Sequence, residues 1–175
     1  MIIAIDPGMT GGLAYYDPDL RSLQCERMPV QWRMVNKKKR HEVDAGALFR
    51  LLRDFPAPID KIVCEEPHAM PGAGATSQFS FGSTCGAVKA VLACLKQVRD
   101  IGAVLYVDPS AWKVAMQCPS DKWRARRRAM DFFPEYGMRW AEPGGDGMAE
   151  AALMAWYGAH YDIKQKVRTP VKRKA

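Results

Sequence analysis

The chain opens with MIIAIDPGMTGG (residues 1–12), an apolar run that reaches Asp6 and passes directly into Pro-Gly and then Gly-Gly. Residues 1–6 have the composition of a buried strand. An unpaired carboxylate is costly at the end of such a strand, so Asp6 needs a partner or a role. Asp6 is either a turn former before Pro-Gly or a functional acid. The choice depends on which other acids the fold brings to it.

Length and composition favour a single domain inside the cell. With 175 residues, the chain is long enough to bury one substantial core. Its five cysteines are odd in number and form no C-x-x-C pair, which argues against a disulfide framework or zinc ribbon. The apolar start is too short for a signal peptide, and no stretch approaches the roughly 20 apolar residues of a membrane helix. We expect a cytoplasmic protein, or one in the DNA-containing compartment of a host cell, that is not secreted.

Positive charge is concentrated in three segments of a chain whose net charge is +7 and whose pI is about 9.3. They are NKKKRH (36–41), KWRARRR (122–128) and KQKVRTPVKRK (164–174). One basic run is often only solvated surface, but three in so short a chain favour a polyanionic partner, nucleic acid first. We expect residues 1–162 to form the folded domain and residues 163–175 to form a basic, flexible tail.

Hydrophobic patterning predicts an α/β domain with a mixed sheet, in the order βββαβαβα with further helices. Strands are expected at residues 1–6, 11–17, 22–28, 60–66 and 102–108. Short links favour antiparallel pairing of the first three. Helices are expected at residues 43–55, 83–98, 109–117, 120–133 and 146–161, with a Gly/Ser/Pro-rich loop at 67–82. In the first helix, the predicted apolar face comprises Val43, Leu48, Leu51 and Leu52.

Four acids lie at the edges of these apolar elements. Asp6 ends the first strand and Glu65 the fourth, while Asp146 and Glu150 lie four apart at the start of the last helix and share one face. Carboxylates are ligands that Mg²⁺ prefers, and four of them packed together without cations would repel. Two such ions about 3.5–4 Å apart can activate a water and stabilise the leaving oxygen of a phosphodiester. With the basic surface, the set predicts a metal-dependent nuclease.

Each acid also has a simpler explanation. Glu65 could be an ordinary charge at a strand end, with its neighbour Glu66 as the functional residue. Asp146 follows Gly-Gly and could be the N-cap of the last helix. Glu150 is hardest to explain in this way, because it begins the apolar run AALMAWY, where a charge is unfavourable.

Five ordered motifs resemble the RuvC-type Holliday junction resolvases: IAIDPGMTGGLAYYD, IVCEEPHAMPGAGATSQFSFGSTCG, DPSAWK, SDKWRARRRAMDFFP and DGMAEAALMAWYG. The resemblance covers residues 1 to about 160 and is strongest to a divergent branch from phages and chloroplasts. It implies a ribonuclease H-like fold, with a five-stranded mixed sheet of three antiparallel and then parallel strands flanked by helices. It also implies a homodimer that uses Mg²⁺ or Mn²⁺ to nick two opposed strands of a four-way DNA junction, leaving 5′-phosphates.

The resemblance assigns the acids to a site for two Mg²⁺ ions, with Mn²⁺ able to substitute. Asp6 matches the aspartate that bridges the metals. Glu65 matches the glutamate three residues before the loop histidine, whereas Glu66 falls where glutamine is common. Asp146 and Glu150 match the last two acids. Bacterial members place that pair three apart with aspartate second, but a spacing of four keeps one helical face and glutamate is longer, so the site is expected to survive.

The resemblance also implies DNA contacts. Lys113 and Lys122 match basic residues that hold the scissile or neighbouring phosphates, and Lys122 is counted with the catalytic residues; a solvated helix lysine is the alternative for both. His68 stands where bacterial members carry a wedging aromatic, and it could stack on a base, meet a phosphate or cap the loop. Phe79 and Phe81 are candidates for base stacking or for core packing. From the basic runs we further expect DNA binding by Lys37, Lys38, Lys39, Arg40 and Arg124.

Small residues line one face of the helix expected at residues 83–98 and the position before it. They are Gly82, Ser83, Gly86, Ala87 and Ala90. In the resembled family this helix lies near the dimer interface. Packing of the same face onto the chain's own sheet is the alternative.

Three other functional classes share parts of this pattern. The first motif also resembles the phosphate loop of actin-like ATPases and sugar kinases, but those proteins need two such domains to clamp ATP. A non-catalytic junction-binding protein would need the basic surface and not the four acids. A metal nuclease of the same fold that acts on other branched or flapped DNA is the main alternative, because residue spacing does not report substrate geometry. We expect a crossover junction endodeoxyribonuclease of DNA recombination and repair.

Overall fold

The computed structural model describes residues 1–66, 68, 72, 74–118 and 121–163. Residues 164–175, which include the third basic run and all but the first residue of the tail predicted at 163–175, lie outside the described residues.

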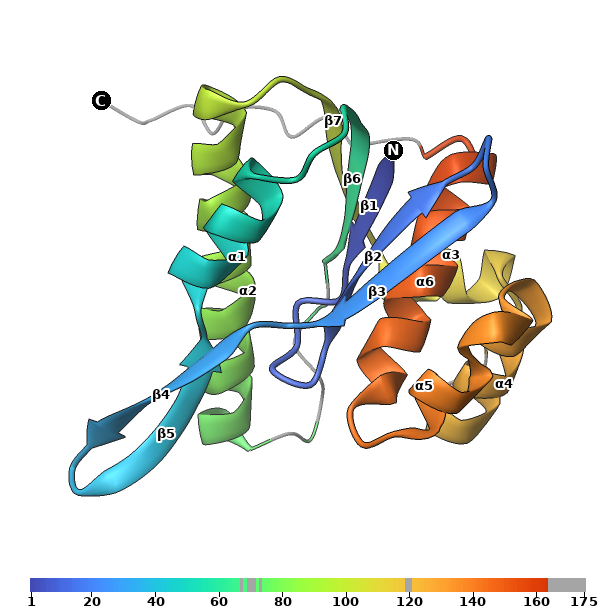
Figure 1. Ribbon diagram of the computed structural model, residues 1–175. Coiled ribbons are helices and arrows are strands. Elements are labelled where there is room, and N and C mark those ends of the chain that lie inside the picture. The colour runs from blue at the N-terminus through green and yellow to red at the C-terminus, as the bar shows by residue number, and fades with distance from the viewer. Residues whose placement is uncertain (67, 69–71, 73, 119–120, 164–175) are drawn as a thin grey trace, which may run out of the picture.

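A five-stranded sheet in the order β3-β2-β1-β6-β7 forms the centre of the molecule (Figure 1). Its strands are β1 (Ile2–Ile5), β2 (Gly12–Asp17), β3 (Ser22–Arg27), β6 (Ile59–Glu65) and β7 (Ile101–Val107). β1 pairs antiparallel with β2 and β2 with β3, while β1 pairs parallel with β6 and β6 with β7. The predicted mixed sheet of three antiparallel and then parallel strands is confirmed.

Helices cover both faces of the sheet. One face packs against α1 (Ala45–Arg53) and α2 (Ala75–Val98). The other packs against α3 (Pro109–Ala115), α4 (Lys122–Phe132), η1 (Pro134–Tyr136), α5 (Gly137–Ala141) and α6 (Gly145–His160). Strand alternation divides the core accordingly, since Ile3 and Ile5 belong to the α1–α2 side while Ala4 belongs to the α6 side.

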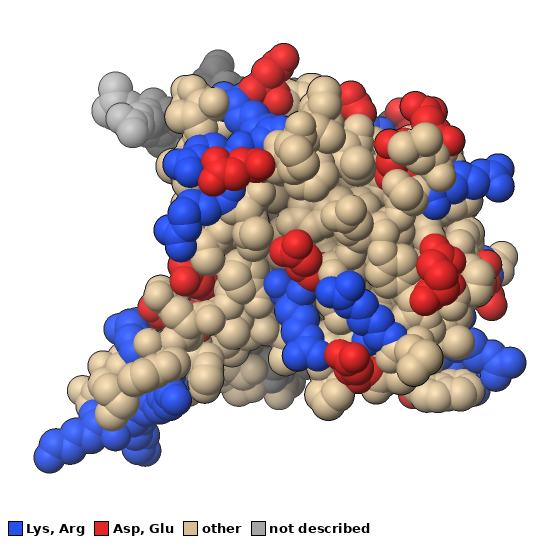
Figure 2. Space-filling model, viewed as in Figure 1, with Lys and Arg blue, Asp and Glu red and all other residues tan. Residues whose placement is uncertain are grey.

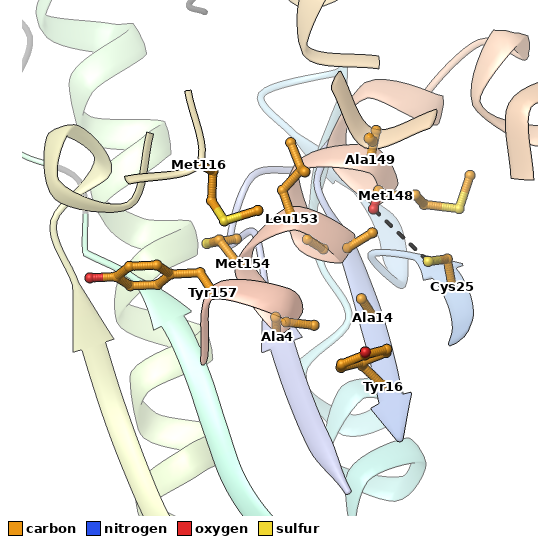
Figure 3. Close-up of a cluster of buried hydrophobic side chains, with 14 of the residues drawn as sticks. Ala4, Ala14, Tyr16, Cys25, Met116, Met148, Ala149, Leu153, Met154 and Tyr157 are labelled. Atoms are coloured by element: carbon orange, nitrogen blue, oxygen red, sulfur yellow. Dashed lines mark hydrogen bonds between the residues drawn. The ribbon is translucent and has the colours of Figure 1, made fainter. Parts of the chain in front are cut away.

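Helix α6 lies almost entirely within the core. Figure 3 shows Ala4 of β1 and Ala14 of β2 beneath it, with Leu153 and Met154 among the α6 side chains that fill the layer. The alanines leave room for the helix to approach the sheet closely. Burying this apolar layer fixes where the first turn of α6 lies relative to the end of β1.

Three local predictions were wrong. Helix α2 begins at Ala75, so half of the loop predicted at residues 67–82 is helical. In α1, Leu48 and Leu52 are buried but Leu51 is 37% exposed, so the predicted apolar face is narrower. The basic segment around residue 37 forms an unpredicted hairpin of β4 (Val30–Val35) and β5 (Lys38–Val43), which make a separate two-stranded sheet.

Among the described residues, no helix combines the length and apolarity required for a bilayer span. All five cysteines fall within the described part of the chain and are free thiols.

Candidate active site

Asp6 follows the last residue of β1, where the chain turns back into β2. The Asp6 backbone N–H donates to the carbonyl of Gly12 at 2.9 Å, and the Asp6 carboxylate accepts from the N–H of Gly8 at 3.2 Å. The carboxylate therefore helps to close the turn that the sequence suggested. It does more than this, because the same turn lies against the start of α6.

Two glycines permit that approach. Gly11, in the turn, pairs as an isolated parallel bridge with Gly147 of α6. A Cβ added to Gly147 would lie 2.4 Å from both the Gly11 Cα and the Thr10 carbonyl oxygen, and such contacts are sterically excluded. Gly11 and Gly12 after the first strand therefore pack directly against Gly147 and Met148 of α6. This contact brings Glu150 of α6 close enough to Asp6 for their charges to interact.

Three of the four predicted acids interact electrostatically. Burial, followed by the charges of Glu65 and Glu150, raises the pKa of Asp6 from its ordinary value of 3.8 to about 7. The nearby ammonium of Lys113 acts in the opposite direction. Asp6, Glu65 and Glu150 come from the ends of two adjacent parallel strands and from the first turns of α6. Their mutual repulsion marks an excess of negative charge at this edge of the sheet.

Glu65 is the last residue of β6 and only 9% exposed. The indole Nε1–H of Trp112 donates to its Oε1 at 2.9 Å, and Trp112 is itself fully buried in α3. Burial raises the pKa of Glu65, although the Trp112 hydrogen bond and Lys113 oppose the change. Trp112 thus fixes one carboxylate oxygen of Glu65.

Glu66, the alternative to Glu65, interacts on a different side of the strand. Its Oε1 accepts from the ammonium of Lys89 in α2 at 2.7 Å. Strand alternation explains the difference, because consecutive side chains point to opposite faces of a sheet. Glu65, rather than Glu66, contributes to the electrostatic cluster around Asp6.

Lys113 occupies a central position among these acids. Its Nζ lies 3.0 Å from an Oε2 of Glu150, and the two side chains are 25% and 16% exposed. Burial acts to lower the pKa of Lys113, but Glu150 and Glu65 outweigh it and raise the pKa. The Lys113 ammonium therefore remains charged and compensates part of the acidic cluster.

Asp146 is drawn toward a different partner. It lies in the first turn of α6, whose N-cap is Gly144, so the N-cap explanation of Asp146 is wrong. Its carboxylate contacts the guanidinium of Arg126 and lies 3.3 Å from the Nζ of Lys122, both from α4. Burial would raise the pKa of Asp146, but these two cations outweigh it and lower the pKa. In this structure Asp146 therefore interacts with α4 rather than with the other three acids.

The acids suit a divalent cation, but they do not enclose one. Within the described residues, no three His, Cys, Asp or Glu side chains form a ready-made metal-binding group. The donor set nevertheless fits Mg²⁺ or Mn²⁺, because it consists of carboxylate oxygens. Burial and then the charges of Glu65 and Glu150 raise the pKa of Asp6, and a bound cation would oppose both effects.

The predicted DNA-contacting residues lie on α2, α3, α4, the β4–β5 hairpin and the segment before α2. His68 is 73% exposed, and its Nε2 lies 2.6 Å from Asp108, the N-cap of α3. Hydrogen bonds from the Ser110 hydroxyl, the His68 ring and the Ser110 backbone N–H hold the pKa of Asp108 low, at about 2. The His68 ring therefore bonds to the cap of α3 while most of it faces solvent.

On the helices, Lys122 is 70% exposed and Arg124 is also exposed, so both can reach a phosphate. Phe79 is 80% exposed on the first turns of α2, whereas Phe81 is half-buried. Residues 37–40 are exposed on the β4–β5 hairpin, apart from the acidic cluster.

Sequence reasoning missed two residues that act on the acids. Trp112 holds Glu65, and Arg126 holds Asp146. The motif DPSAWK contains the tryptophan, but nothing in its pattern indicates that the indole bonds to a strand more than forty residues earlier. Arg126 is one of several arginines in a basic run, and only the packing of α4 against α6 distinguishes it.

Neither a protein-family model nor a curated protein matches the sequence. The structure is similar to Thermus thermophilus RuvC in complex with a Holliday junction substrate, with a TM-score of 0.51 and 14% identity over 90% of this chain and 94% of that one. Another T. thermophilus RuvC structure matches with a TM-score of 0.46 and 16% sequence identity, over 90% of this chain and 95% of that one. At such identities the first comparison establishes the fold, and the predicted RuvC-like architecture is confirmed.

Proposed function

We propose that this RuvC-like domain is a metal-dependent endonuclease that resolves four-way DNA junctions by nicking two opposed strands. The observation that supports it best is the coupled set of Asp6, Glu65 and Glu150 at the sheet edge, with Lys113 among them. Repelling carboxylates are unfavourable unless they serve a cation. A basic helix, α4, lies beside this site, as a phosphodiester substrate requires.

In this proposal Asp6, Glu65, Asp146 and Glu150 hold two divalent ions, Mg²⁺ or Mn²⁺. Asp146 joins the donor set by giving up its contacts to Arg126 and Lys122. When bound, the ions would supply an activated water and stabilise the departing oxygen, so that a 5′-phosphate and a 3′-hydroxyl remain.

The protein's own residues position these groups. Trp112 keeps one oxygen of Glu65 occupied and thereby orients the other toward Asp6. Lys113 shares its charge between Glu150 and the reacting phosphate. Lys122, released from Asp146, contacts the phosphate as a mobile point charge, which suits lysine. Arg126 and Arg124 bind phosphates farther along the backbone and fix the register of the DNA.

A homodimer is part of the proposal, because two opposed nicks need two sites. The predicted small-residue face of α2 is turned outward: Gly82 and Gly86 are exposed, and a Cβ added to either meets no atom within 4 Å. The alternative, that this face packs on the chain's own sheet, is wrong. An exposed face of this kind allows another helix to approach closely.

The test is cleavage of a synthetic mobile four-way junction beside matched duplex, flap and replication-fork substrates. Reactions contain Mg²⁺, Mn²⁺ or EDTA, and Asp6→Asn serves as the inactive control. We expect paired nicks with 5′-phosphate ends in the junction, in the presence of either metal only. Preferred cutting of flaps or forks would identify the alternative nuclease, and cleavage in EDTA would contradict the metal site.

A further inference from the structure

The β4–β5 hairpin is not part of the central sheet, and none of its residues belongs to the acidic site. Its six-residue strands pair from Val30 opposite Val43 to Val35 opposite Lys38. The two turn residues, Asn36 and Lys37, both have positive φ, 49° and 61°. This is the turn geometry that matches the twist of a hairpin. In Figure 1 the hairpin extends outward past the first turns of α2.

The surface of the hairpin is unusual for an element exposed to water. Trp32 is 56% exposed and Met34 is 59% exposed. An isolated two-stranded hairpin is only marginally stable in water. Here Arg33 and Glu42 join the strands at 2.6 Å, and the Lys39 ammonium lies 4.3 Å from the centre of the Trp32 ring. The ribbon is thus held in shape across its strands while its large apolar side chains remain available.

Strand alternation gives the hairpin two different faces. The pairing puts Trp32 opposite His41 and Met34 opposite Lys39, which makes one face aromatic, apolar and basic. Arg33 lies opposite Arg40 on the other face, which lines a groove of about 500 Å³ against α2. The first of these faces carries Trp32 beside Lys39, whereas Lys38 and Arg40 lie on the second face of the same narrow ribbon.

Charge indicates what the hairpin would bind. Lysine or arginine fills each of the positions 37–40, and Glu42, the acid of β5, is already paired with Arg33. Figure 2 shows these basic side chains gathered at the tip of the hairpin without red atoms among them. A polyanion complements this tip. An exposed indole ring among cations suits nucleic acid in particular.

We propose that the β4–β5 hairpin is a DNA-binding arm, in which Lys38, Lys39 and Arg40 contact phosphates and Trp32 stacks on a base left unpaired at the branch. The inference rests on the proposed function, since it takes branched DNA as the substrate. Six residues per strand give the arm a length of about 20 Å. In Figure 1 the hairpin and α4 lie on opposite sides of the sheet edge that carries Asp6. DNA at the acidic site would then contact both.

The phosphate contacts are tested by the salt dependence of binding. The variant Lys38→Gln/Lys39→Gln/Arg40→Gln is compared with a control that loses the same charge elsewhere, Arg50→Gln/Arg53→Gln/Lys96→Gln. All are made on the Asp6→Asn background, so that binding is measured without cleavage. The slope of log K against log salt should fall by about 2–3 for the hairpin variant and stay unchanged for the control, with at least about tenfold weaker binding near 0.1 M salt.

The stacking contact is tested with Trp32→Ala on the same background, with Leu20→Ala as an exposed apolar control. Leu20 is 76% exposed in the β2–β3 turn. Trp32→Ala should weaken binding to the four-way junction by about fivefold to 150-fold, and Trp32→Phe should restore most of it. Binding to intact duplex should change little, because duplex offers no unpaired base at a branch.

Equal affinities and salt slopes in hairpin and control variants would overturn the inference. The inference would also be overturned if the hairpin variants differed from wild type in sedimentation coefficient but not in DNA affinity. That result would show that the groove receives a second copy of the chain. The outcome is separable from that of the proposed function. If wild type never cut junctions but the hairpin variants still lost DNA affinity, the proposed reaction would be wrong and the DNA-binding arm would be supported.

Discussion

Replacing Asp6 with asparagine should make the metal-free protein more stable at neutral and alkaline pH. The folded state holds the Asp6 proton up to about pH 7, whereas the ordinary value of 3.8 applies to the unfolded chain. As pH rises between these values, the unfolded state gives up its proton first and folding becomes less favourable. Above about pH 7 the full cost is present. Asparagine keeps an oxygen for the Gly8 N–H and carries no charge.

The magnitude follows from the same pKa difference. At about 1.36 kcal/mol for each pH unit, it corresponds to a cost on the order of 4 kcal/mol. Water penetration and side-chain rotation reduce the free-energy cost of the charged Asp6 carboxylate in the folded state. We therefore expect a measured gain in unfolding free energy of about 1–3 kcal/mol at pH 8. In a chain of this size that gain raises the melting temperature by about 2–12 °C.

The assay is urea unfolding in EDTA from pH 5 to pH 8.5, for wild type, Asp6→Asn and the exposed control Asp131→Asn. The gain for Asp6→Asn should grow with pH and level off above about pH 7, while the control should stay within about 0.5 kcal/mol of wild type. Added Mg²⁺ should stabilise wild type and have little effect on Asp6→Asn. A pH-independent loss of stability in Asp6→Asn would refute the reasoning, because it would show that the carboxylate only closes the turn.

Three other changes test the site and its packing. Glu65→Gln should abolish junction cleavage while retaining DNA affinity, and Glu66→Gln should remain active in the same gel assay; the reverse result would transfer the role to Glu66. Gly147→Ala should lower the unfolding free energy by about 3 kcal/mol or more through its clash with the turn, whereas Gly46→Ala in α1, whose Cβ would meet only the ends of the Asp44 and Arg50 side chains at 3.4 Å, should raise it by about 0.5–1 kcal/mol; similar denaturation midpoints for both would contradict the close approach. Deleting residues 164–175 should weaken DNA binding and its salt dependence without changing Mg²⁺-dependent cleavage of saturating DNA, and identical salt titrations would show that the tail contributes nothing.

Much of the architecture could be predicted from the sequence, because strand and helix periodicities are local properties. The apolar run before Asp6 and the run ending at Glu65 were both predicted as strands. A short turn explains why the first pairs antiparallel with β2, and a long crossover connection explains why it pairs parallel with β6. Two of the three wrong local predictions have a clear physical reason. The first turns of α2 were missed because they extend beyond the core: its buried residues begin only at Thr84, so no apolar periodicity marks the helix from Ala75. The hairpin was missed because charge and ring contacts, rather than alternating burial, stabilise its strands.

The sequence alone identified which carboxylates to consider, since an acid beside an apolar run is costly wherever it falls. Only the tertiary structure decided how they are used. It joined Glu65 to the indole of Trp112, turned Glu66 toward Lys89 and held Asp146 against Arg126. Such pairings depend on which elements pack together, and side chains far apart along the chain carry no local signal of the distance that will separate them once folded.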